Sequence, residues 1–505
     1  MAPPKSPSSP HIVMFPFMAQ GHIIPFLTLA KLLDDRTPYT ITFVSTPLNI
    51  KNLQSSLPPD TSIRLTSLPF NPSDHGLPSN AENTNSIPFH LFIHLCQATQ
   101  TLQPSFYHLL TSISQQDCGP PLCIIGDIFL GWTVDVARQF DIFHVAFSSC
   151  GAYSMAAYFS LWLHLPHAKT RLETFQLPGF PETFRLHRSQ LASYLREADG
   201  SDPWSVYIQK QISLSLHSNG MLCNAIEEME TTGLEIFRRI IAGIPVWCVG
   251  PLIPPSFIDS SSSSSSHSLK LSLGRTGKEP GISIDSCTSW LNLHHPRSVL
   301  YISFGSQNTI SIPQMMELAL GLEASGKPFI WVIRPPIGFD VSEDFRVEWL
   351  PEGFEERITE TKRGMLVKKW APQVEILSHG SIGGFLSHCG WNSMVESLSQ
   401  GVPLIGWPMA AEQFYNAKMM EEELGVCVEI GRGVEEIVGR EKVEKVIGVV
   451  MGGTEKGEDM KREAVRVGEM IKAAMRGGEG VEKGSSVAAI DDFIKTALSK
   501  RGVVE

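Results

Sequence analysis

Short apolar runs alternate with amphipathic segments along the first half of the chain. The run at 11–17 begins with β-branched residues, and a glycine-containing turn separates it from 23–35, where apolar residues recur at helical spacing. This order predicts a βα unit, with Pro25 in the first turn of the helix, where a missing N–H costs nothing. Further strands are expected at 39–46, 121–127 and 144–149 and in the segment 220–230, with a helix at 132–140.

The second half of the chain repeats this alternation. Helices are expected at 312–326, 393–401 and 489–500, and strands at 298–306, 328–335, 364–372, 383–388 and 402–408. Strands that alternate with helices predict parallel sheets covered on both faces. The sequence therefore predicts two α/β domains that face each other across a cleft.

The predicted domain boundaries follow from breaks in this pattern. The segment 253–283 contains seven consecutive serines and no hydrophobic period, which is typical of a flexible linker. We expect a disordered leader at 1–10, a first domain at 11–252, a second domain at 284–476, and a segment with a C-terminal helix at 477–505.

Composition and charge restrict the function and the compartment. Apolar residues make up 42% of the 505 positions, which is typical of a globular protein, and the net charge of −11 argues against a nucleic-acid partner. The nine cysteines include no C-x-x-C pair and predict reduced thiols. The leader lacks the apolar core of a signal peptide, and no apolar run is long enough to span a bilayer. We expect a cytoplasmic protein, and nothing in the sequence specifies its oligomeric state.

The stretch 383–408, GGFLSHCGWNSMVESLSQGVPLIGWP, places polar groups where a strand leads into a helix. Unpaired N–H groups and the dipole at a helix start favour an anion. Gly390 permits a close approach of the backbone, and His388 adds a donor. A diphosphate site is one interpretation. The other is a capping box formed by Ser393 and Glu396, which needs no ligand.

A longer segment, from Trp370 to Gln413, closely resembles the signature box of plant family 1 glycosyltransferases, which use UDP-sugars. The matching positions are Trp370, Gln373, His388, Gly390, Trp391, Asn392, Ser393, Glu396, Pro408 and Gln413. LPEGFEER at 350–357, SVLYISFGS at 298–306 and LPGFPE at 177–182 extend the resemblance along the chain. It implies a GT-B fold of two Rossmann-like domains, with the acceptor at the first domain and the nucleotide at the second. It also implies that the C-terminal helix packs back on the N-terminal domain.

The resemblance also implies roles for individual residues of the donor site. Trp370 would stack on the uracil, whose edge would bond the Ala371 backbone, and Gln373 and Glu396 would hold the ribose. The diphosphate would be bound by His388, Asn392, Ser393, the Trp391 backbone and Ser306. Glu412 and Gln413 would bond the sugar hydroxyls, although Glu412 replaces the aspartate common in the family. Because Gln413 and Trp391 resemble the glucose-using members, UDP-glucose is the expected donor.

The candidate catalytic pair lies in the first domain. His22 is expected at the start of the first helix, where the helix dipole disfavours the imidazolium and helps to keep a base neutral. Asp127, at the end of a strand, offers a carboxylate partner that would fix the tautomer. A lone histidine in such a turn is more often structural, but the family pattern places its catalytic His and Asp at these two positions. Asp135 is the competing carboxylate, interpreted as a solvated or capping charge.

The implied reaction is direct displacement with inversion at the anomeric carbon, with His22 as the base. No cofactor is expected, since the UDP-sugar is a co-substrate, and no DxD-type motif suggests a metal. Phe17, Phe129, Ser149 and the segment 87–100 are candidates to line an apolar pocket for a flavonoid, another phenolic or a terpenoid, with core packing as the alternative for 87–100.

Other classes fit the sequence less well. The motifs G-x-G-x-x-G, G-K-[ST] in a P-loop and G-x-S-x-G are missing, which argues against a dehydrogenase, a P-loop enzyme and a serine hydrolase. A catalytically silent UDP-sugar-binding protein that acts as a sensor or partner stays the alternative, although the presence of both His22 and Asp127 argues against it.

Overall fold

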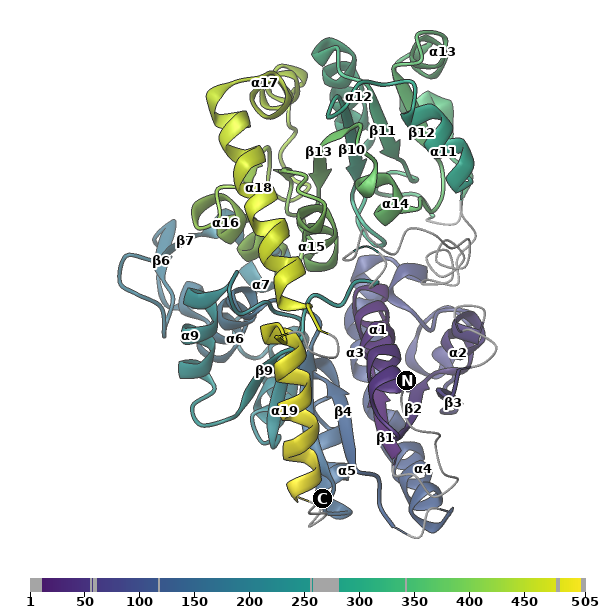
Figure 1. Cartoon of the computed structure of the whole chain (residues 1–505), viewed down its shortest axis with the longest axis vertical. Helices are drawn as coiled ribbons and strands as arrows, with labels where there is room; N and C mark the ends of the chain where they lie inside the picture. Colours follow the sequence, from purple (N-terminus) through teal and green to yellow (C-terminus); the bar gives the residue numbers. More distant parts are fainter. Residues whose placement is uncertain are drawn as a thin grey trace.

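The computed structural model describes residues 11–54, 57, 61–116, 119–254, 257, 281–340, 343–477 and 482–500. The chain forms two lobes, each built on a parallel sheet (Figure 1). The predicted leader, the serine run and most of the predicted linker lie outside the described residues. The predicted domain boundaries stay predictions.

The N-terminal lobe contains a seven-stranded sheet of order β3-β2-β1-β4-β5-β8-β9, in which all neighbours are parallel. Its strands are β1 (His11–Phe15), β2 (Thr40–Ser45), β3 (Arg64–Ser67), β4 (Cys123–Asp127), β5 (Phe143–Ser148), β8 (Gly220–Cys223) and β9 (Val246–Cys248). Its helices are α1 (Gln20–Arg36), α2 (Pro47–Gln54), α3 (Phe92–Ala98), α4 (Gln103–Gln116), α5 (Thr133–Gln139), α6 (Ala152–His164), α7 (Ser193–Arg196), α8 (Pro203–Ser215) and α9 (Thr231–Ile240). A small antiparallel hairpin, β6 (Thr174–Gln176) and β7 (Arg185–His187), lies apart from the main sheet.

The C-terminal lobe contains a six-stranded parallel sheet of order β12-β11-β10-β13-β14-β15. Its strands are β10 (Val299–Ser303), β11 (Phe329–Val332), β12 (Gly364–Val367), β13 (Ile382–Ser387), β14 (Leu404–Gly406) and β15 (Cys427–Glu429). Its helices are α11 (Ile284–Leu291), α12 (Ile312–Ser325), α13 (Phe354–Glu360), α14 (Gln373–Ser378), α15 (Trp391–Ser399), α16 (Gln413–Glu422), α17 (Arg440–Met451) and α18 (Glu455–Ala474). The predicted α/β architecture with two parallel sheets is confirmed.

The central strands are buried on both faces, because helices cover each side of the sheet. In β1, Ile12 and Met14 belong to one apolar cluster and Val13 and Phe15 to another, as expected when successive side chains point to opposite faces. This double coverage is the reason that the strand segments read as continuous apolar runs in the sequence.

Helix α1 begins earlier than its apolar pattern indicated. It starts at Gln20, so Pro25 lies inside the helix, and the prediction that this proline occupies the first turn is wrong. A proline has no N–H, so the carbonyl four residues before it, that of Gly21, lacks the usual i→i−4 hydrogen bond of a helix. Gly21 immediately precedes His22, so this free carbonyl lies beside the candidate base.

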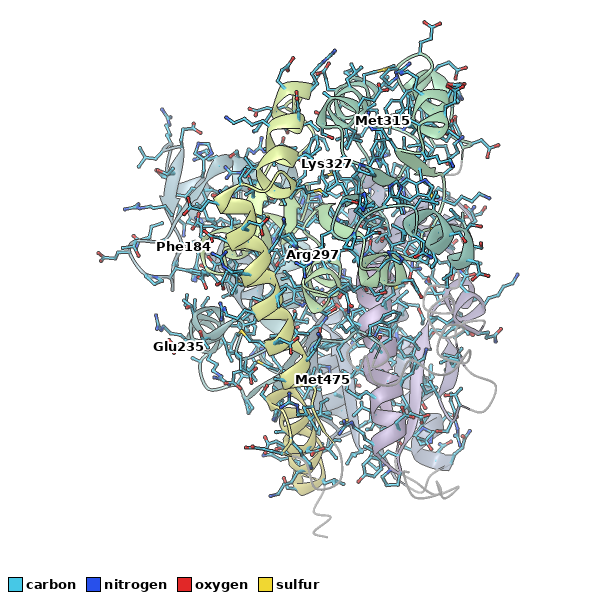
Figure 2. All side chains as sticks on the ribbon, turned by 45° about the horizontal axis from the view of Figure 1, so that its top comes forward. Phe184, Glu235, Arg297, Met315, Lys327 and Met475 are labelled. Carbon is cyan, nitrogen blue, oxygen red and sulfur yellow. The ribbon has the colours of Figure 1, made fainter. Side chains whose placement is uncertain are left out.

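The chain ends by returning to the first lobe. Helix α18 runs along the C-terminal lobe to Met475, and α19 (Ser485–Lys500) follows it onto the N-terminal lobe (Figures 1 and 2). The Trp247 indole in β9 donates to the Asp492 carboxylate at 2.8 Å and meets the Phe493 ring at 5.6 Å between centroids. Phe493 is buried in the same apolar cluster as β1 and α1, so α19 is part of the N-terminal core.

Candidate active site

A cavity of about 270 Å³ lies between the lobes, and residues from both of them line it. It is located where β1, β4 and β5 end in one lobe and β10, β11 and β13 end in the other. The carboxyl ends of parallel strands are the usual location of ligand sites in such sheets. Every candidate site residue named from the sequence lines this cavity except Phe17 and Asp127, which lie directly behind it.

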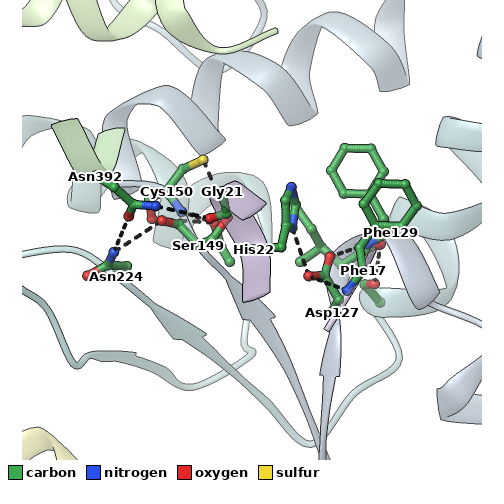
Figure 3. Close-up of polar contacts among 12 residues, drawn as sticks. Phe17, Gly21, His22, Asp127, Phe129, Ser149, Cys150, Asn224 and Asn392 are labelled. Atoms are coloured by element: carbon green, nitrogen blue, oxygen red, sulfur yellow. Dashed lines mark hydrogen bonds and ion pairs between the residues drawn. The ribbon is translucent and has the colours of Figure 1, made fainter. Parts of the chain in front are cut away.

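His22 and Asp127 lie side by side on the side of the site that the N-terminal lobe forms (Figure 3). His22 Nδ1 is 2.8 Å from Asp127 Oδ2, although the two residues are 105 positions apart in the chain. Asp127 ends β4 and is almost completely buried, and it accepts from the backbone N–H groups of Phe17 at 3.1 Å and Phe129 at 3.0 Å. Three donors thus hold the carboxylate in place, and the contact at Nδ1 leaves the other imidazole nitrogen, Nε2, for a ligand.

The pKa of His22 lies above its usual value of 6.5. Burial alone lowers this pKa, but the attraction and hydrogen bond of Asp127, with a smaller contribution from Glu412, outweigh it. The helix dipole at the start of α1 favours the neutral ring, but the raised pKa indicates that the carboxylate in direct contact has the larger effect.

Aromatic rings form the acceptor side of the cavity. Phe129 lines it and meets the His22 ring edge-on at 5.3 Å. Phe17, predicted to line the pocket, is completely buried behind Phe129, with the two rings stacked at 5.3 Å. Ser149 lines the cavity as predicted. Phe89 and Phe92 of the predicted segment 87–100 also line this wall. Residues that sequence reasoning did not single out complete it: Met155, Tyr158, Tyr194 and Trp204.

Both interpretations of the segment 87–100, pocket lining and core packing, hold for parts of it. Phe89 and Phe92 line the cavity, whereas Leu95 and Cys96 are completely buried in the core. Phe89, half exposed, stacks on Trp204 with ring centroids 5.9 Å apart at the mouth of the cavity. The aromatic residues of the wall that sequence reasoning did not single out come from α6, α7 and α8, which are distant in sequence from the segment 87–100.

The N-terminus of α15 opens into the same cavity. Its N-cap residue is Gly390, which has no side chain to bond the first N–H groups. Ser393 and Glu396 are therefore inside the helix, and the capping-box interpretation is wrong. Instead, Gln373 Nε2 donates to Ser393 Oγ at 3.0 Å and to Glu396 Oε2 at 2.8 Å. A helix start without a side-chain cap leaves its N–H groups free for an anion.

Two glycines make room for His388 at this helix start. A Cβ on Gly305 or on Gly390 would lie 2.5 Å from Nε2 of the His388 ring, which is too close for either position to carry a side chain without movement. Burial, together with the nearby charge of Arg334, lowers the pKa of His388 to about 4. The imidazole is therefore neutral at pH 7 and can donate one hydrogen bond to a ligand.

The remaining donor-site candidates surround this helix start. Trp370, Ala371 and Gln373 follow β12, and the Tyr301 hydroxyl donates to Gln373 Oε1 at 3.3 Å. Ser306 lies beyond β10, and its carbonyl accepts from Arg334. Gln413 Oε1 accepts from the backbone of Met409 and Ala410, which fixes the side chain at the cavity wall.

Glu412 faces the N-terminal lobe from the donor side. Burial is the largest influence on its carboxyl group and raises its pKa, and the positive charge of His22 acts in the opposite direction. The carboxyl group also contacts the Cys150 thiol, which belongs to the loop between β5 and α6. Cys150 was not identified from the sequence, because a lone cysteine gives no signal of such a contact.

The first two residues of α15 tie the lobes together. Asn392 Nδ2 donates to the free carbonyl of Gly21 at 3.1 Å, and Asn224 Nδ2 donates to Asn392 Oδ1 at 3.3 Å (Figure 3). The Trp391 indole donates to the Asn224 carbonyl at 2.6 Å. Asn224 is a further residue that sequence reasoning missed. These bonds place the mouth of α15 directly opposite His22.

The described residues contain no cluster of three or more His, Cys, Asp or Glu side chains suited to hold a metal ion. Among the same residues, no helix is long and apolar enough to cross a membrane.

Family comparisons agree with this geometry. Residues 9–254 match the family described as "Glycosyltransferase, N-terminal domain", and residues 287–449 match "UDP-glucoronosyl and UDP-glucosyl transferase". Crocetin glucosyltransferase 3 of Crocus sativus is 47% identical over 95% of this chain and 98% of its own length. UDP-glycosyltransferase 92A1 of Arabidopsis thaliana is 44% identical over 98% of both chains.

Solved structures of the same family have the same fold. Glycyrrhiza uralensis UGT73P12, complexed with glycyrrhetinic acid 3-O-monoglucuronide, is 29% identical and superimposes with a TM-score of 0.81 over 98% of this chain and 96% of its own. Phytolacca americana UGT2, complexed with UDP-2fluoro-glucose and pterostilbene, gives a TM-score of 0.75 at 27% identity over 97% of this chain and all of its own. The two parallel sheets are those of a GT-B protein, and the chain belongs to the plant family 1 UDP-glycosyltransferases.

Proposed function

We propose that this glycosyltransferase transfers glucose from UDP-glucose to a hydroxyl group of a small, apolar acceptor, with inversion at the anomeric carbon. The observation that carries the proposal is the position of His22, which lines one wall of the cavity with Asp127 behind it, opposite the start of α15, which has no side-chain cap. A base on one side and an anion site on the other are what a direct displacement requires.

His22 acts as the base in this mechanism. Its Nε2 removes the proton of the acceptor hydroxyl, and the oxygen attacks the anomeric carbon while the bond from that carbon to the UDP oxygen breaks. Asp127 holds Nδ1 and stabilises the imidazolium that forms. The free N–H groups of α15 and the donor groups of His388, Asn392 and Ser393 take up the charge of the departing UDP.

The roles of the donor groups follow from the family resemblance, and the position of these residues around one cavity supports them. Trp370 and the Ala371 backbone hold the uracil, and Gln373 and Glu396, already bonded to each other, hold the ribose. Ser306 and the Trp391 N–H contribute to the diphosphate site, and Glu412 and Gln413 bind the glucose hydroxyls. The extra methylene of Glu412, compared with aspartate, is accommodated by its contact with Cys150.

The acceptor is a flat or extended apolar molecule, such as a flavonoid, another phenolic or a terpenoid. Support comes from the aromatic wall of Phe89, Phe92, Phe129, Tyr158 and Trp204. The relative from Crocus sativus is named for the acceptor crocetin, and UGT2 of Phytolacca americana was crystallised with pterostilbene. Both names refer to extended conjugated molecules, for which stacked aromatic walls are suitable.

The test is release of UDP from UDP-glucose with EDTA present, in the presence of pooled flavonoid, terpenoid and phenol acceptors. We expect acceptor-dependent release by the unaltered enzyme, a loss of roughly 100- to 10,000-fold in His22→Ala, and a β-glucoside as the product by NMR. Binding of UDP-glucose without release from any acceptor would favour the silent UDP-sugar-binding protein. An α-linked product would contradict inversion.

A further inference from the structure

The cavity contains a cation that the donor-site assignments leave without a role. Among the residues that line it, Arg334 and Lys369 are the basic side chains with a permanent charge. Lys369 is exposed at the rim, whereas Arg334 is partly buried and follows the carboxyl end of β11 by two residues. Exposed charges are screened by solvent, so these two cations face different environments.

Arg334 has no acidic partner among the residues that the structure describes. Its one hydrogen bond there runs from Nη1 to the backbone carbonyl of Ser306. Burial lowers the pKa of Arg334 to about 10, and no carboxylate acts to raise it. The guanidinium is therefore charged at neutral pH and lacks a counter-ion, which is an unfavourable state for a cation removed from bulk water.

The surroundings of Arg334 indicate which ligand supplies the counter-ion. The guanidinium holds the carbonyl of Ser306, and its charge also lowers the pKa of His388. Ser306 and His388 are two of the residues assigned to the diphosphate in the proposed function. A planar guanidinium with several free donors binds phosphate oxygens in two parallel hydrogen bonds.

We propose that Arg334 is a binding residue for the diphosphate of the nucleotide sugar, positioned by its bond to the Ser306 carbonyl. This inference rests on the proposed function and adds a charged group to a site otherwise built from neutral donors. Bound UDP supplies the missing counter-ion, and the cation also stabilises the negative charge that increases on UDP as the sugar leaves.

Comparing the affinities for UDP and for uridine distinguishes an effect of the Arg334 charge from a change in the shape of the site. Uridine keeps the base and ribose but lacks the phosphates. UDP affinity is measured by calorimetric titration and uridine affinity by ligand-observed NMR. We expect Arg334→Gln, which keeps a donor for the Ser306 carbonyl, to bind UDP on the order of tenfold to a hundredfold more weakly and uridine with unchanged affinity. Arg334→Lys keeps the charge and is expected to recover most of the UDP affinity.

Lys369→Gln is the matched control, since it removes the other cavity cation from an exposed position and is expected to change UDP affinity less than about threefold. Equal weakening of UDP and uridine in Arg334→Gln would overturn the inference, because Arg334 would then only support the shape of the site. Unchanged UDP affinity in Arg334→Gln would overturn it as well. Failure of the unaltered enzyme to bind UDP at all would instead contradict the proposed function.

Discussion

At the scale of single residues, the site depends on side chains that are held by several partners at once. Asp127 accepts two backbone N–H groups and contacts the His22 imidazole, and His388 fits between Gly305 and Gly390. Each functional group therefore has a fixed position before a ligand arrives. Such preorganisation lets hydrogen bonds act on the reacting atoms without a cost for reorientation.

The raised pKa of His22 gives a pH prediction with a definite sign. The base works as the neutral imidazole, so kcat/KM should rise with pH through an apparent pKa above 6.5. Asp127→Asn removes the carboxylate that stabilises the imidazolium, so the pKa of His22 should fall and the acidic limb should move to lower pH. The plateau of kcat should drop by on the order of 100-fold or more, because the tautomer is no longer fixed. Rates measured across the pH range check both effects.

Asp135→Asn is the control for this change, because Asp135 lies in the first turn of α5, away from the cavity lining. Its pH profile should match that of the unaltered enzyme. An acidic limb that stays in place in Asp127→Asn would contradict the assignment of His22 as the titrating base.

At the scale of elements, the proline inside α1 has a consequence for the contact between the lobes. Pro25 leaves the Gly21 carbonyl unpaired, and Asn392 at the start of α15 uses it as an acceptor. The Asn392 amide has two N–H donors, so one can hold Gly21 while the other bonds the diphosphate. A feature that weakens one helix thus provides a connection between the candidate base and the donor site.

Pro25→Ala should therefore change stability and activity in opposite directions. The new N–H bonds the Gly21 carbonyl within the helix, so the melting temperature should rise, since a helix-interior proline costs up to about 3 kcal/mol. Competition for that carbonyl weakens the bond from Asn392, and kcat should fall by on the order of two- to tenfold. Thermal unfolding and steady-state rates on the same preparation measure both quantities.

The double variant with Asn392→Ala distinguishes this mechanism from a general disturbance of α1. Without the amide there is no bond to lose, so adding Pro25→Ala to Asn392→Ala should cause no further decrease in kcat. A higher melting temperature with unchanged kcat in Pro25→Ala would show that the Gly21–Asn392 bond does not contribute to turnover.

At the scale of the whole molecule, α19 makes the end of the chain part of the first lobe. Phe493 packs beside Trp247 in the core that contains β1 and α1, although the helix follows the C-terminal lobe in sequence. The donor-site residues lie in the other lobe. Stability of the N-terminal lobe and affinity for UDP are therefore expected to respond separately to changes in α19.

Phe493→Ala should lower the free energy of unfolding of the N-terminal lobe by about 3–5 kcal/mol through loss of buried apolar contacts. UDP affinity, measured by titration under native conditions, should change little. Urea unfolding followed by fluorescence measures the first effect, and Lys495→Ala, at an exposed position of the same helix, should leave the transition in place. A parallel loss of UDP affinity in Phe493→Ala would contradict the independence of the two lobes.

The sequence by itself determined the alternation of strands and helices, because local periodicity and glycine turns encode each element independently of the rest of the chain. The expected strands at 298–306, 328–335 and 364–372 extend too far at their carboxyl ends, where β10, β11 and β12 stop short of Ser306, Arg334 and Trp370. These polar and aromatic residues continue the local pattern, but they line the cavity beyond the ends of the strands.

The tertiary structure decided everything that depends on contacts between distant segments. The motif resemblance identified His22, Asp127 and the residues of α15, but their juxtaposition requires segments 105 and 371 positions apart to meet. It also decided that Gly390 occupies the N-cap position of α15, that Phe17 lies behind Phe129, and that Arg334 has no acidic partner among the described residues. The physical reason is that burial, charge balance and hydrogen-bond partners are properties of the folded neighbourhood, which no local window of the sequence contains.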